Sequence, residues 1–282
     1  MKTTFVAISN MSGIACASDT DRTIYGLSKS LPVAVAVNPR SPIPWEDIIN
    51  DYLIAGEIQE HEAFAEYGDD FERRLSKVPV SKSFENLTYE EGNIIFMGYG
   101  KEDLFPCIYD VTVSLDPEKQ ILYYSQKELQ PLSHENEADI RYLGDLESVS
   151  TLIWGTTDQS WDKCLKELKK VYDVYKRRVR KQFEGTQYEQ EVEDQLARFD
   201  AERIFYKRIE ECSEKVCDQV LSGIETFSIQ DMVDAAETLV NAEVRLDHLS
   251  AGLKAPSQSI REIAVLTRIE GLTWIKHSLF AL

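Results

Sequence analysis

The chain begins with short runs of hydrophobic residues whose pattern predicts β-strands. Residues 3–8 and 14–18 are rich in β-branched and apolar side chains, and the polar residues and glycine between them have the composition of a turn. The chain is therefore expected to open with a β-hairpin. A third strand is expected over 32–37, where valine and alanine alternate as in a strand packed on both faces. Asn38 and Pro39 end this strand.

Helices and then a second group of strands are expected in the middle of the chain. A helix begins near Trp45, and residues 46–91 are mostly helical by pattern, with 13 acidic and 4 basic side chains and thus a net charge of −9. Three further strands are expected over residues 93–97, 106–114 and 120–125. A polar, acidic loop is expected over 130–145, with the next helix starting near Asp145.

From Trp161 onward the hydrophobic spacing becomes that of amphipathic helices. One helical face is predicted from apolar residues three and four positions apart, namely Cys164, Leu165, Leu168, Val171, Tyr172, Tyr175 and Val179. Gly185 ends this helix, a second helix continues to about Gly223, and Ser228 is a suitable first residue for a third.

The charges of the first two of these helices are opposite. Residues 161–183 hold 9 basic and 3 acidic side chains, a net +6, whereas 184–218 hold 11 acidic and 5 basic ones, a net −6. The basic run 176–181 has the composition of a nucleic-acid patch, but an oppositely charged neighbour favours a second interpretation, in which it faces its own partner helix. Residues 157–222 are accordingly expected to form a helical hairpin.

The last hydrophobic runs, 263–266 and 272–275, are expected to be two short strands around a turn. Strands at both ends, strands in the middle and helices between them predict an α+β fold in which the terminal hairpins pair in one sheet. The prediction is one domain over 1–282, with the hairpin 157–222 as an insertion.

Composition excludes several classes of function. The chain has 31 Lys and Arg against 49 Asp and Glu, a net charge of −18, which argues against binding to nucleic acid or to an anionic membrane surface. No apolar run approaches the roughly 18 residues of a membrane span. The 5 cysteines form no CxxC pair and the 4 histidines no metal motif, so neither a disulfide framework nor a metal or other cofactor is expected. Ser9, Asn10 and Ser12 interrupt the short apolar N-terminus, which predicts a cytoplasmic protein rather than a secreted one.

The opening motifs resemble those of a known family. Thr3-Thr4-Phe5-Val6-Ala7-Ile8, Gly13, Ala17-Ser18-Asp19 and Lys29 before Ser-Leu-Pro-Val are similar to the start of proteasome β-type subunits, which are N-terminal nucleophile (Ntn) hydrolases. Segments 95–100, 105–110, 263–267 and 271–275 are similar to later strands of the same family. The resemblance implies a four-layer αββα sandwich with 157–222 inserted. It also implies the catalytic residues Thr3, Asp19 and Lys29.

The chemistry of that trio has a physical basis. A threonine hydroxyl needs a nearby base to act as a nucleophile. If Thr3 were the first residue, its own α-amine, with a reference pKa of about 7.7–8.0, would serve as that base. The Lys29 ammonium would lower the pKa values of the amine and the hydroxyl, and the Asp19 carboxylate would hold the ammonium. Each residue also has an ordinary alternative role, as a strand threonine, a cap at a strand end and a surface lysine.

The sequence departs from the family pattern at several positions. Met1 and Lys2 precede Thr3, so a maturation step must expose its amine. Asn38-Pro39 replaces the glycine that donates an oxyanion N–H, and proline has no N–H to donate. The turn that precedes the family's third helix reads Gly144-Asp145-Leu146-Glu147-Ser148 here and lacks the family's serine. Lys254 stands where the family has an aspartate, with Ser257 as the nearest serine.

Two functions follow. The first is a threonine-type hydrolase that cleaves amide or peptide bonds after Thr3 is exposed. The alternative is a catalytically inactive Ntn-fold protein that binds or assembles through the 157–222 helices. Because the family forms rings, the resemblance implies a homo-oligomer in both cases.

Overall fold

The structure is a computed structural model that describes residues 3–28, 31–54, 63–79, 84, 89–116, 118–133, 136–144, 146–155, 158–198, 201–253 and 260–277. The chain divides into two compact units. The first contains residues 1–149 and 221–282, and the second, which we call the helical unit, contains 150–220.

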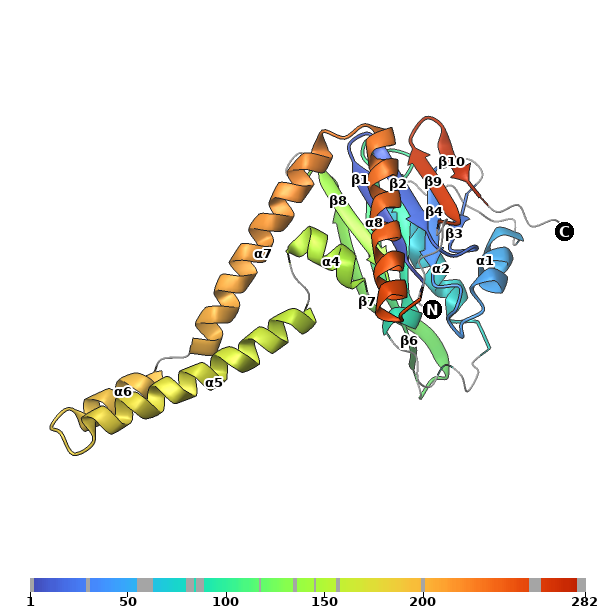
Figure 1. Ribbon diagram of the computed structural model, residues 1–282. Coiled ribbons are helices and arrows are strands. Elements are labelled where there is room, and N and C mark those ends of the chain that lie inside the picture. Colours follow the sequence, from blue (N-terminus) through green and yellow to red (C-terminus); the bar gives the residue numbers. More distant parts are fainter. Residues whose placement is uncertain are drawn as a thin grey trace. The chain divides into compact units, whose positions relative to one another are not determined.

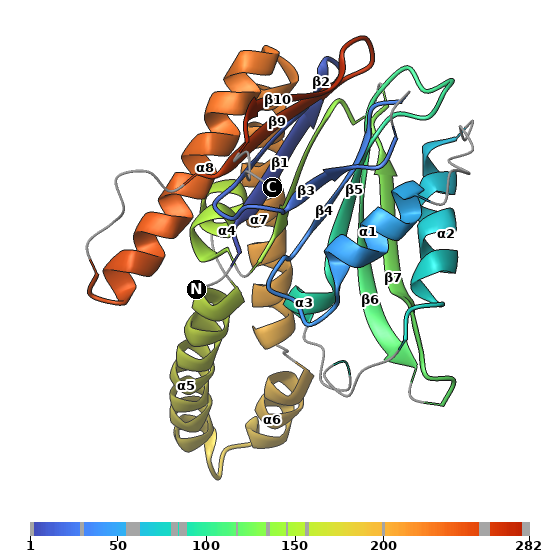
Figure 2. The ribbon, with the colours of Figure 1, turned by 90° about the vertical axis from the view of Figure 1, so that its right-hand side faces the viewer.

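The first unit contains two antiparallel β-sheets of five strands each (Figures 1 and 2). The first sheet has the order β10-β9-β2-β1-β8, with β1 Phe5–Asn10, β2 Gly13–Ser18, β8 Ala138–Leu143, β9 Glu262–Thr267 and β10 Gly271–Lys276. The second has the order β3-β4-β5-β6-β7, with β3 Ile24–Gly26, β4 Val33–Val37, β5 Asn93–Gly98, β6 Cys107–Asp116 and β7 Ile121–Pro131.

The two terminal hairpins join in the first sheet, as the sequence predicts. β1 and β2 pair with Ala7 opposite Cys16, and β2 pairs with β9 with Cys16 opposite Ala264. All five residues from Val33 to Val37 are buried, as expected for the alternating valine and alanine run. The predicted α+β fold class is confirmed by this combination of two sheets with surrounding helices.

One strand lies where the sequence predicts a loop, and another lies where no strand is predicted. β8 occupies 138–143, inside the segment expected to be a polar loop, and it pairs along the whole of β1. Its charged residues do not point to bulk water, because the guanidinium of Arg141 pairs with Asp139 and Asp110. β3 has only three residues, too few to show a hydrophobic alternation, and it pairs with β4.

A hydrophobic core lies between the two sheets. It combines side chains of the first sheet with side chains of the second, namely Phe5, Ala7, Ile14, Cys16, Leu143, Ala264 and Leu266 with Ile24, Ala34, Ala36, Ile95, Met97 and Ile108. Many of these residues are small, which allows the two sheets to pack closely around the head of β1.

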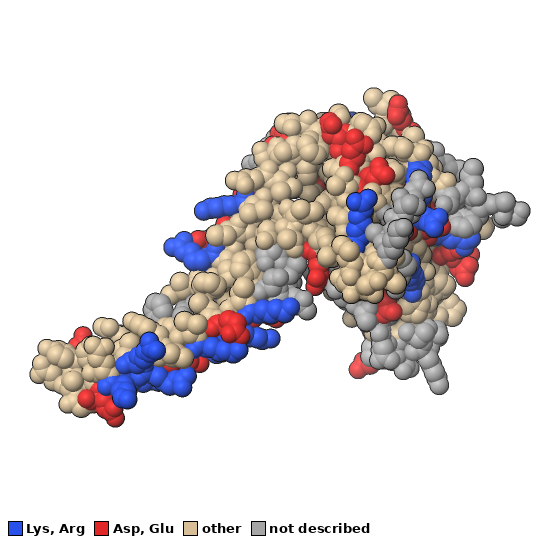
Figure 3. All heavy atoms as spheres, viewed as in Figure 1, with Lys and Arg blue, Asp and Glu red and all other residues tan. Residues whose placement is uncertain are grey.

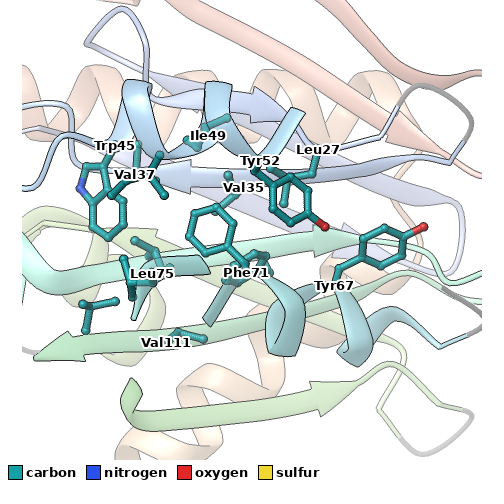
Figure 4. Packing of buried hydrophobic residues seen from close by; sticks show 14 of the residues in the cluster. Leu27, Val35, Val37, Trp45, Ile49, Tyr52, Tyr67, Phe71, Leu75 and Val111 are labelled. Carbon is teal, nitrogen blue, oxygen red and sulfur yellow. The ribbon is translucent and has the colours of Figure 1, made fainter. Parts of the chain in front are cut away.

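A second core covers the other face of the second sheet. Helices α1 (Trp45–Ile54) and α2 (Phe64–Leu75) contribute aromatic rings that pack on valines of β4 and β6 (Figure 4). Phe71, for example, lies between Tyr52 and Phe96, with ring centroids 5.6 and 5.4 Å away. The four-residue helix α3 (Tyr89–Gly92) leads into β5.

Helix α8 (Ile229–Ser250) packs on the first sheet, against β1, β2 and β9 (Figure 2). It buries Met232, Val233, Ala236, Val240 and Val244. Ser228 caps it as the sequence predicts, because the Ser228 side chain accepts from the Asp231 N–H while Asp231 accepts from the Ser228 N–H. These two interactions pair N–H groups at the start of the helix that would otherwise lack a partner.

The helical unit contains α5 (Asp158–Phe183), α6 (Glu189–Arg198) and most of α7 (Ala201–Glu225), with part of α4 (Glu147–Trp154). The second predicted helix is thus divided into α6 and α7. Figure 3 shows Lys and Arg side chains gathered over α5. One of them, Arg180, donates from Nε to Glu193 Oε1 of α6 over 2.7 Å, so a cation of the basic run does meet the acidic stretch.

The apolar face predicted for α5 is largely open to solvent within the described part of the helical unit. Leu165 is buried, but Val171 is 66% exposed and Tyr175 59% exposed. Helix α6 has no buried residue. Among the helices described, none is both long and apolar enough to span a bilayer.

Candidate active site

Thr3 lies two residues before the start of β1 and is buried, with 3% of its surface exposed. Its Oγ1 donates a hydrogen bond to Asn38 Oδ1 over 2.9 Å. Asn38 follows the last residue of β4, so this bond joins the head of the first sheet to the end of a strand in the second. The same Asn38 oxygen accepts from the backbone N–H of Arg40 over 3.0 Å, which fixes the carboxamide orientation.

Asp19 follows the last residue of β2 and holds the neighbour of Thr3. Its Oδ1 accepts from the Thr4 N–H over 2.7 Å, and its own N–H donates to the Thr4 carbonyl over 3.1 Å. The Thr20 hydroxyl donates to the same Oδ1 over 2.9 Å. Asp19 therefore clamps the head of β1 through both backbone groups of Thr4.

The surroundings of Asp19 have two opposite effects on the pKa of its carboxyl group. Burial raises the pKa of the Asp19 carboxyl, since the charged form loses water. The N–H of Thr4, the hydroxyl of Thr20 and the positive charge of Arg40 lower the pKa and so offset part of this effect. The net direction is a raised pKa.

A close backbone approach places β8 beside Thr3. Gly144, the residue after β8, has a φ of +105°, and a Cβ at this position would overlap the Thr3 carbonyl oxygen. Glycine is required there for both its conformation and its lack of a side chain. The sequence places Gly144 in the loop expected over 130–145, but only the structure places it against the candidate nucleophile.

The structure brings two of the three predicted residues to one end of the β1–β2 hairpin. Phe5 and Ser18 are the last paired residues at this end of the hairpin, and both Thr3 and Asp19 lie just beyond them. Asp19 is bonded to Thr4 and not directly to Thr3 among the hydrogen bonds described. Lys29 lies outside the described residues, as do Lys254 and Ser257.

Asn38 is the partner that sequence reasoning missed. The sequence singled out this position only because an asparagine replaces the expected glycine, whereas in the structure it accepts the Thr3 hydroxyl. A polar residue directly after a buried strand was the available signal. Asn38 Oδ1 is a neutral acceptor, so it orients the hydroxyl without being able to take its proton at neutral pH.

Ser148, another position singled out in the sequence, contributes its backbone N–H to a hydrogen bond with Glu243. It lies in the first turn of α4, and its N–H donates to Glu243 Oε2 over 2.7 Å. Burial raises the pKa of the Glu243 carboxyl, and the N–H groups of Ser148 and Val149 partly offset this.

A surface hollow of about 340 Å³ adjoins the chain that follows Asn38. It is lined by Arg22, Tyr25 and the segment from Pro39 to Asp47, apart from Arg40. No group of three or more His, Cys, Asp or Glu residues within the described ranges is placed to hold a metal ion. Among the described residues, the polar groups at and near Thr3 include its own hydroxyl, the Asn38 carboxamide, the Asp19 carboxylate and backbone amides.

No family model and no curated protein matches the sequence. Among solved structures, Anbu (ancestral beta-subunit) from Yersinia bercovieri is similar to part of the chain, with 14% sequence identity and a TM-score of 0.36. The match covers 53% of this chain and 62% of that protein, so the chain spans less than two thirds of its length.

Proposed function

We propose that the chain is an Ntn hydrolase, of the proteasome β-subunit kind, that cleaves amide or peptide bonds once Thr3 is exposed by loss of Met1 and Lys2. In this proposal the two sheets, with α8 on one side and α1 and α2 on the other, are the four-layer αββα sandwich of that family. The observation that carries it is the position of Thr3, buried at the head of β1 with its hydroxyl oriented by Asn38 and its neighbour clamped by Asp19.

The roles of the residues follow from their chemistry. The Thr3 Oγ1 attacks the substrate carbonyl, and the freed α-amine of Thr3 takes the hydroxyl proton and passes it to the leaving amine as the C–N bond breaks. Water then hydrolyses the ester formed on Thr3, which releases the acid and restores the hydroxyl. Asn38 Oδ1 holds the hydroxyl in place before the amine is free. Asp19 fixes the backbone of Thr4, and Lys29 lowers the pKa of the amine by its positive charge.

An intact-mass measurement of the purified protein tests this proposal. We expect a mass short by Met1 and Lys2, and amidase activity on short peptide substrates that Thr3→Ala abolishes and Thr3→Ser retains in part. Thr4→Val is the matched control, because it keeps a buried β-branched side chain and the N–H that donates to Asp19. A wild-type mass that still includes Met1 and Lys2 would overturn the proposal.

A second candidate function, assembly without catalysis, is favoured by the helical unit. Val171 and Tyr175 of α5 and Ile204 and Tyr206 of α7 are 47% to 66% exposed. Large apolar side chains exposed in such numbers are common at contacts with other proteins. The opposite charges of 161–183 and 184–218 fit a second copy of the same chain, because a two-fold contact would place α5 of one copy along the acidic helices of the other.

Sedimentation velocity tests this second candidate. Val171→Glu and Tyr175→Glu are expected to shift the protein toward monomers, while Gln182→Glu, the same charge change at an exposed polar position of α5, is not. A wild-type protein that is monomeric at high micromolar concentration would contradict it. The cytoplasmic location and the lack of a nucleic-acid or membrane partner stay predictions from the sequence.

A further inference from the structure

Glu262 is a completely buried carboxylate outside the trio of candidate catalytic residues. It is the first residue of β9, and both of its oxygens face the backbone of the segment that follows Asp19. Oε1 accepts from the Arg22 N–H over 2.9 Å, and Oε2 accepts from the N–H groups of Thr23 and Ile24 over 3.0 and 3.1 Å. Three consecutive backbone donors therefore converge on one carboxylate.

That convergence requires an uncommon backbone conformation. Arg22 has a φ of +63°, in the left-handed region that residues other than glycine adopt rarely. A residue stays in such a conformation when its surroundings hold it there. The buried Glu262 carboxylate supplies that hold, and β9 itself is tied to β2 because the Arg261 N–H donates to the Ser18 carbonyl over 2.8 Å.

Hydrogen bonds continue from this segment to the head of β1. The Thr23 hydroxyl donates to the Thr20 carbonyl over 3.0 Å and accepts from the Ser18 hydroxyl over 2.9 Å. The Thr20 N–H donates to Ser18 Oγ over 3.1 Å, and the Thr20 hydroxyl donates to Asp19. Asp19 in turn accepts from the Thr4 N–H. A continuous set of bonds thus connects Glu262 to the residue next to Thr3.

His277 lies on the outer side of the carboxylate. Its Nδ1 is 3.2 Å from Glu262 Oε1, and its ring lies 4.2 Å from the Trp274 ring, centroid to centroid. The imidazole is 33% exposed, whereas the Glu262 side chain is fully buried. Burial raises the pKa of Glu262, whereas the three N–H groups and a positively charged His277 lower it.

Other titratable or charged groups face this pair from the elements packed around it. These are Cys16 of β2, Tyr25 of β3, Arg22 of the preceding segment, and Glu46 of α1, which pairs with the Arg22 guanidinium. Arg22 directs its guanidinium to Glu46 and its N–H to Glu262. Among the described residues, His277 is the one that forms an ion-pair contact with the Glu262 carboxylate.

We propose that Glu262 is a positioning residue for the Thr3 site, which holds segment 19–24 and through it Asp19 and Thr4, and that the contact with His277 supports the carboxylate that does so. The role in catalysis rests on the proposed hydrolase function. The positioning itself does not rest on that function, because it concerns only the series of hydrogen bonds that leads from Glu262 to Thr4. An amide or a protonated carboxyl at this position would present a hydrogen-bond donor to backbone donors, so segment 19–24 would loosen.

Amide hydrogen exchange, followed residue by residue by NMR, tests the positioning. Glu262→Gln should lower the protection of the Arg22, Thr23 and Ile24 amides and also of the Thr4 amide, each by about tenfold or more, since a buried donor loses its partner. Glu243→Gln is the matched control. Glu243 is likewise buried and accepts from two backbone N–H groups, those of Ser148 and Val149, so its loss should leave the Thr4 amide unchanged. Unchanged Thr4 protection in Glu262→Gln would overturn the proposal.

A second variant keeps the test decisive if Glu262→Gln does not fold. His277→Gln leaves the Glu262 carboxylate in place, but the glutamine has no positive charge to lower the pKa of Glu262. As the pH is lowered, Thr4 protection, corrected for the intrinsic exchange rate, should therefore be lost at a higher pH in His277→Gln than in the wild type. A contact with a merely structural role would not move this profile, so identical profiles would overturn the proposal. An unprocessed wild-type mass would refute the hydrolase function while leaving both exchange results valid.

Discussion

Arg141 of β8 lies 3.0 Å from Asp110 of β6, from Nη1 to Oδ2, and so connects the two sheets. Its Nε also donates to Asp139 Oδ2 over 2.9 Å. The Arg141 side chain is 13% exposed, and the two carboxylates are 21% and 13% exposed. One guanidinium therefore balances two carboxylates that have lost most of their water.

Removing this cation should be costly. Arg141→Met leaves two nearby carboxylates without their cation, and we expect the free energy of unfolding at pH 7 to fall by about 3 kcal/mol. Urea denaturation measures it. Arg208→Met is the control, because the Arg208 side chain is 74% exposed and its pair with Glu211 is worth at most about 1 kcal/mol. Equal losses in the two variants would contradict the structural role given to Arg141.

Gly144 is expected to tolerate no side chain. Gly185→Ala is the control, because Gly185 has a φ of +72° with open space around it, and we expect it to cost about 1–2 kcal/mol from conformation alone. Gly144→Ala adds an overlap with the Thr3 carbonyl and should lower the free energy of unfolding by a further 1–3 kcal/mol, roughly the cost of overpacking. Similar thermal midpoints for the two variants would show that β8 does not approach Thr3 so closely.

The five cysteines should differ sharply in reactivity. Cys164 and Cys212 are exposed, whereas Cys16 and Cys217 are buried. Burial raises the pKa of both Cys16 and Cys107 to about 12, which leaves little thiolate to react at neutral pH. Brief alkylation of the native protein, followed by peptide mass spectrometry, should label Cys164 and Cys212 first. Labelling of Cys16 at a comparable rate would show that the core between the sheets opens readily.

The cap of α8 should make stability depend on pH. The hydroxyl and N–H of Ser228 lower the pKa of Asp231 in the folded protein, so this residue contributes stability above its unfolded pKa and loses it as the pH falls through the lower folded value. Asp231→Asn should therefore lower the urea midpoint at pH 7, and the difference from the wild type should shrink as the pH falls below about 3.9.

Asp247→Asn serves as the control for the cap. Asp247 is an exposed carboxylate near the other end of α8, where a negative charge is unfavourable to the helix dipole. Its replacement should leave the urea midpoint unchanged or raise it slightly. A pH-independent difference between Asp231→Asn and the wild type would contradict the role of the charged cap.

Hydrophobic pattern predicts most of the elements. The opening hairpin, the buried run Val33–Val37, the helix at Trp45 and the capped helix after Ser228 all carry their signal within a few neighbouring residues. The pattern fails at β8, because Asp139 and Arg141 look like loop residues until Asp110, the partner of Arg141 about thirty positions away, is known. It also fails at β3, which is too short to show a period.

The candidate site is likewise only partly predictable from the sequence. A threonine heading a buried strand and an aspartate ending the next are visible in the sequence. That Asp19 bonds to Thr4 and that Asn38 accepts the Thr3 hydroxyl are contacts between residues 15 and 35 positions apart. No local spacing encodes them.

The sequence by itself determined the α+β class, the pairing of the terminal hairpins and the identity of Thr3 and Asp19 as candidates, because these depend on local periodicity and on the order of motifs. Only the tertiary structure decided what the buried polar groups do. Glu262, Asn38 and Arg141 are ordinary polar residues in the sequence. Burial removes their water, and each must then find a partner in another segment of the chain, so their roles exist only once the fold has brought those segments together.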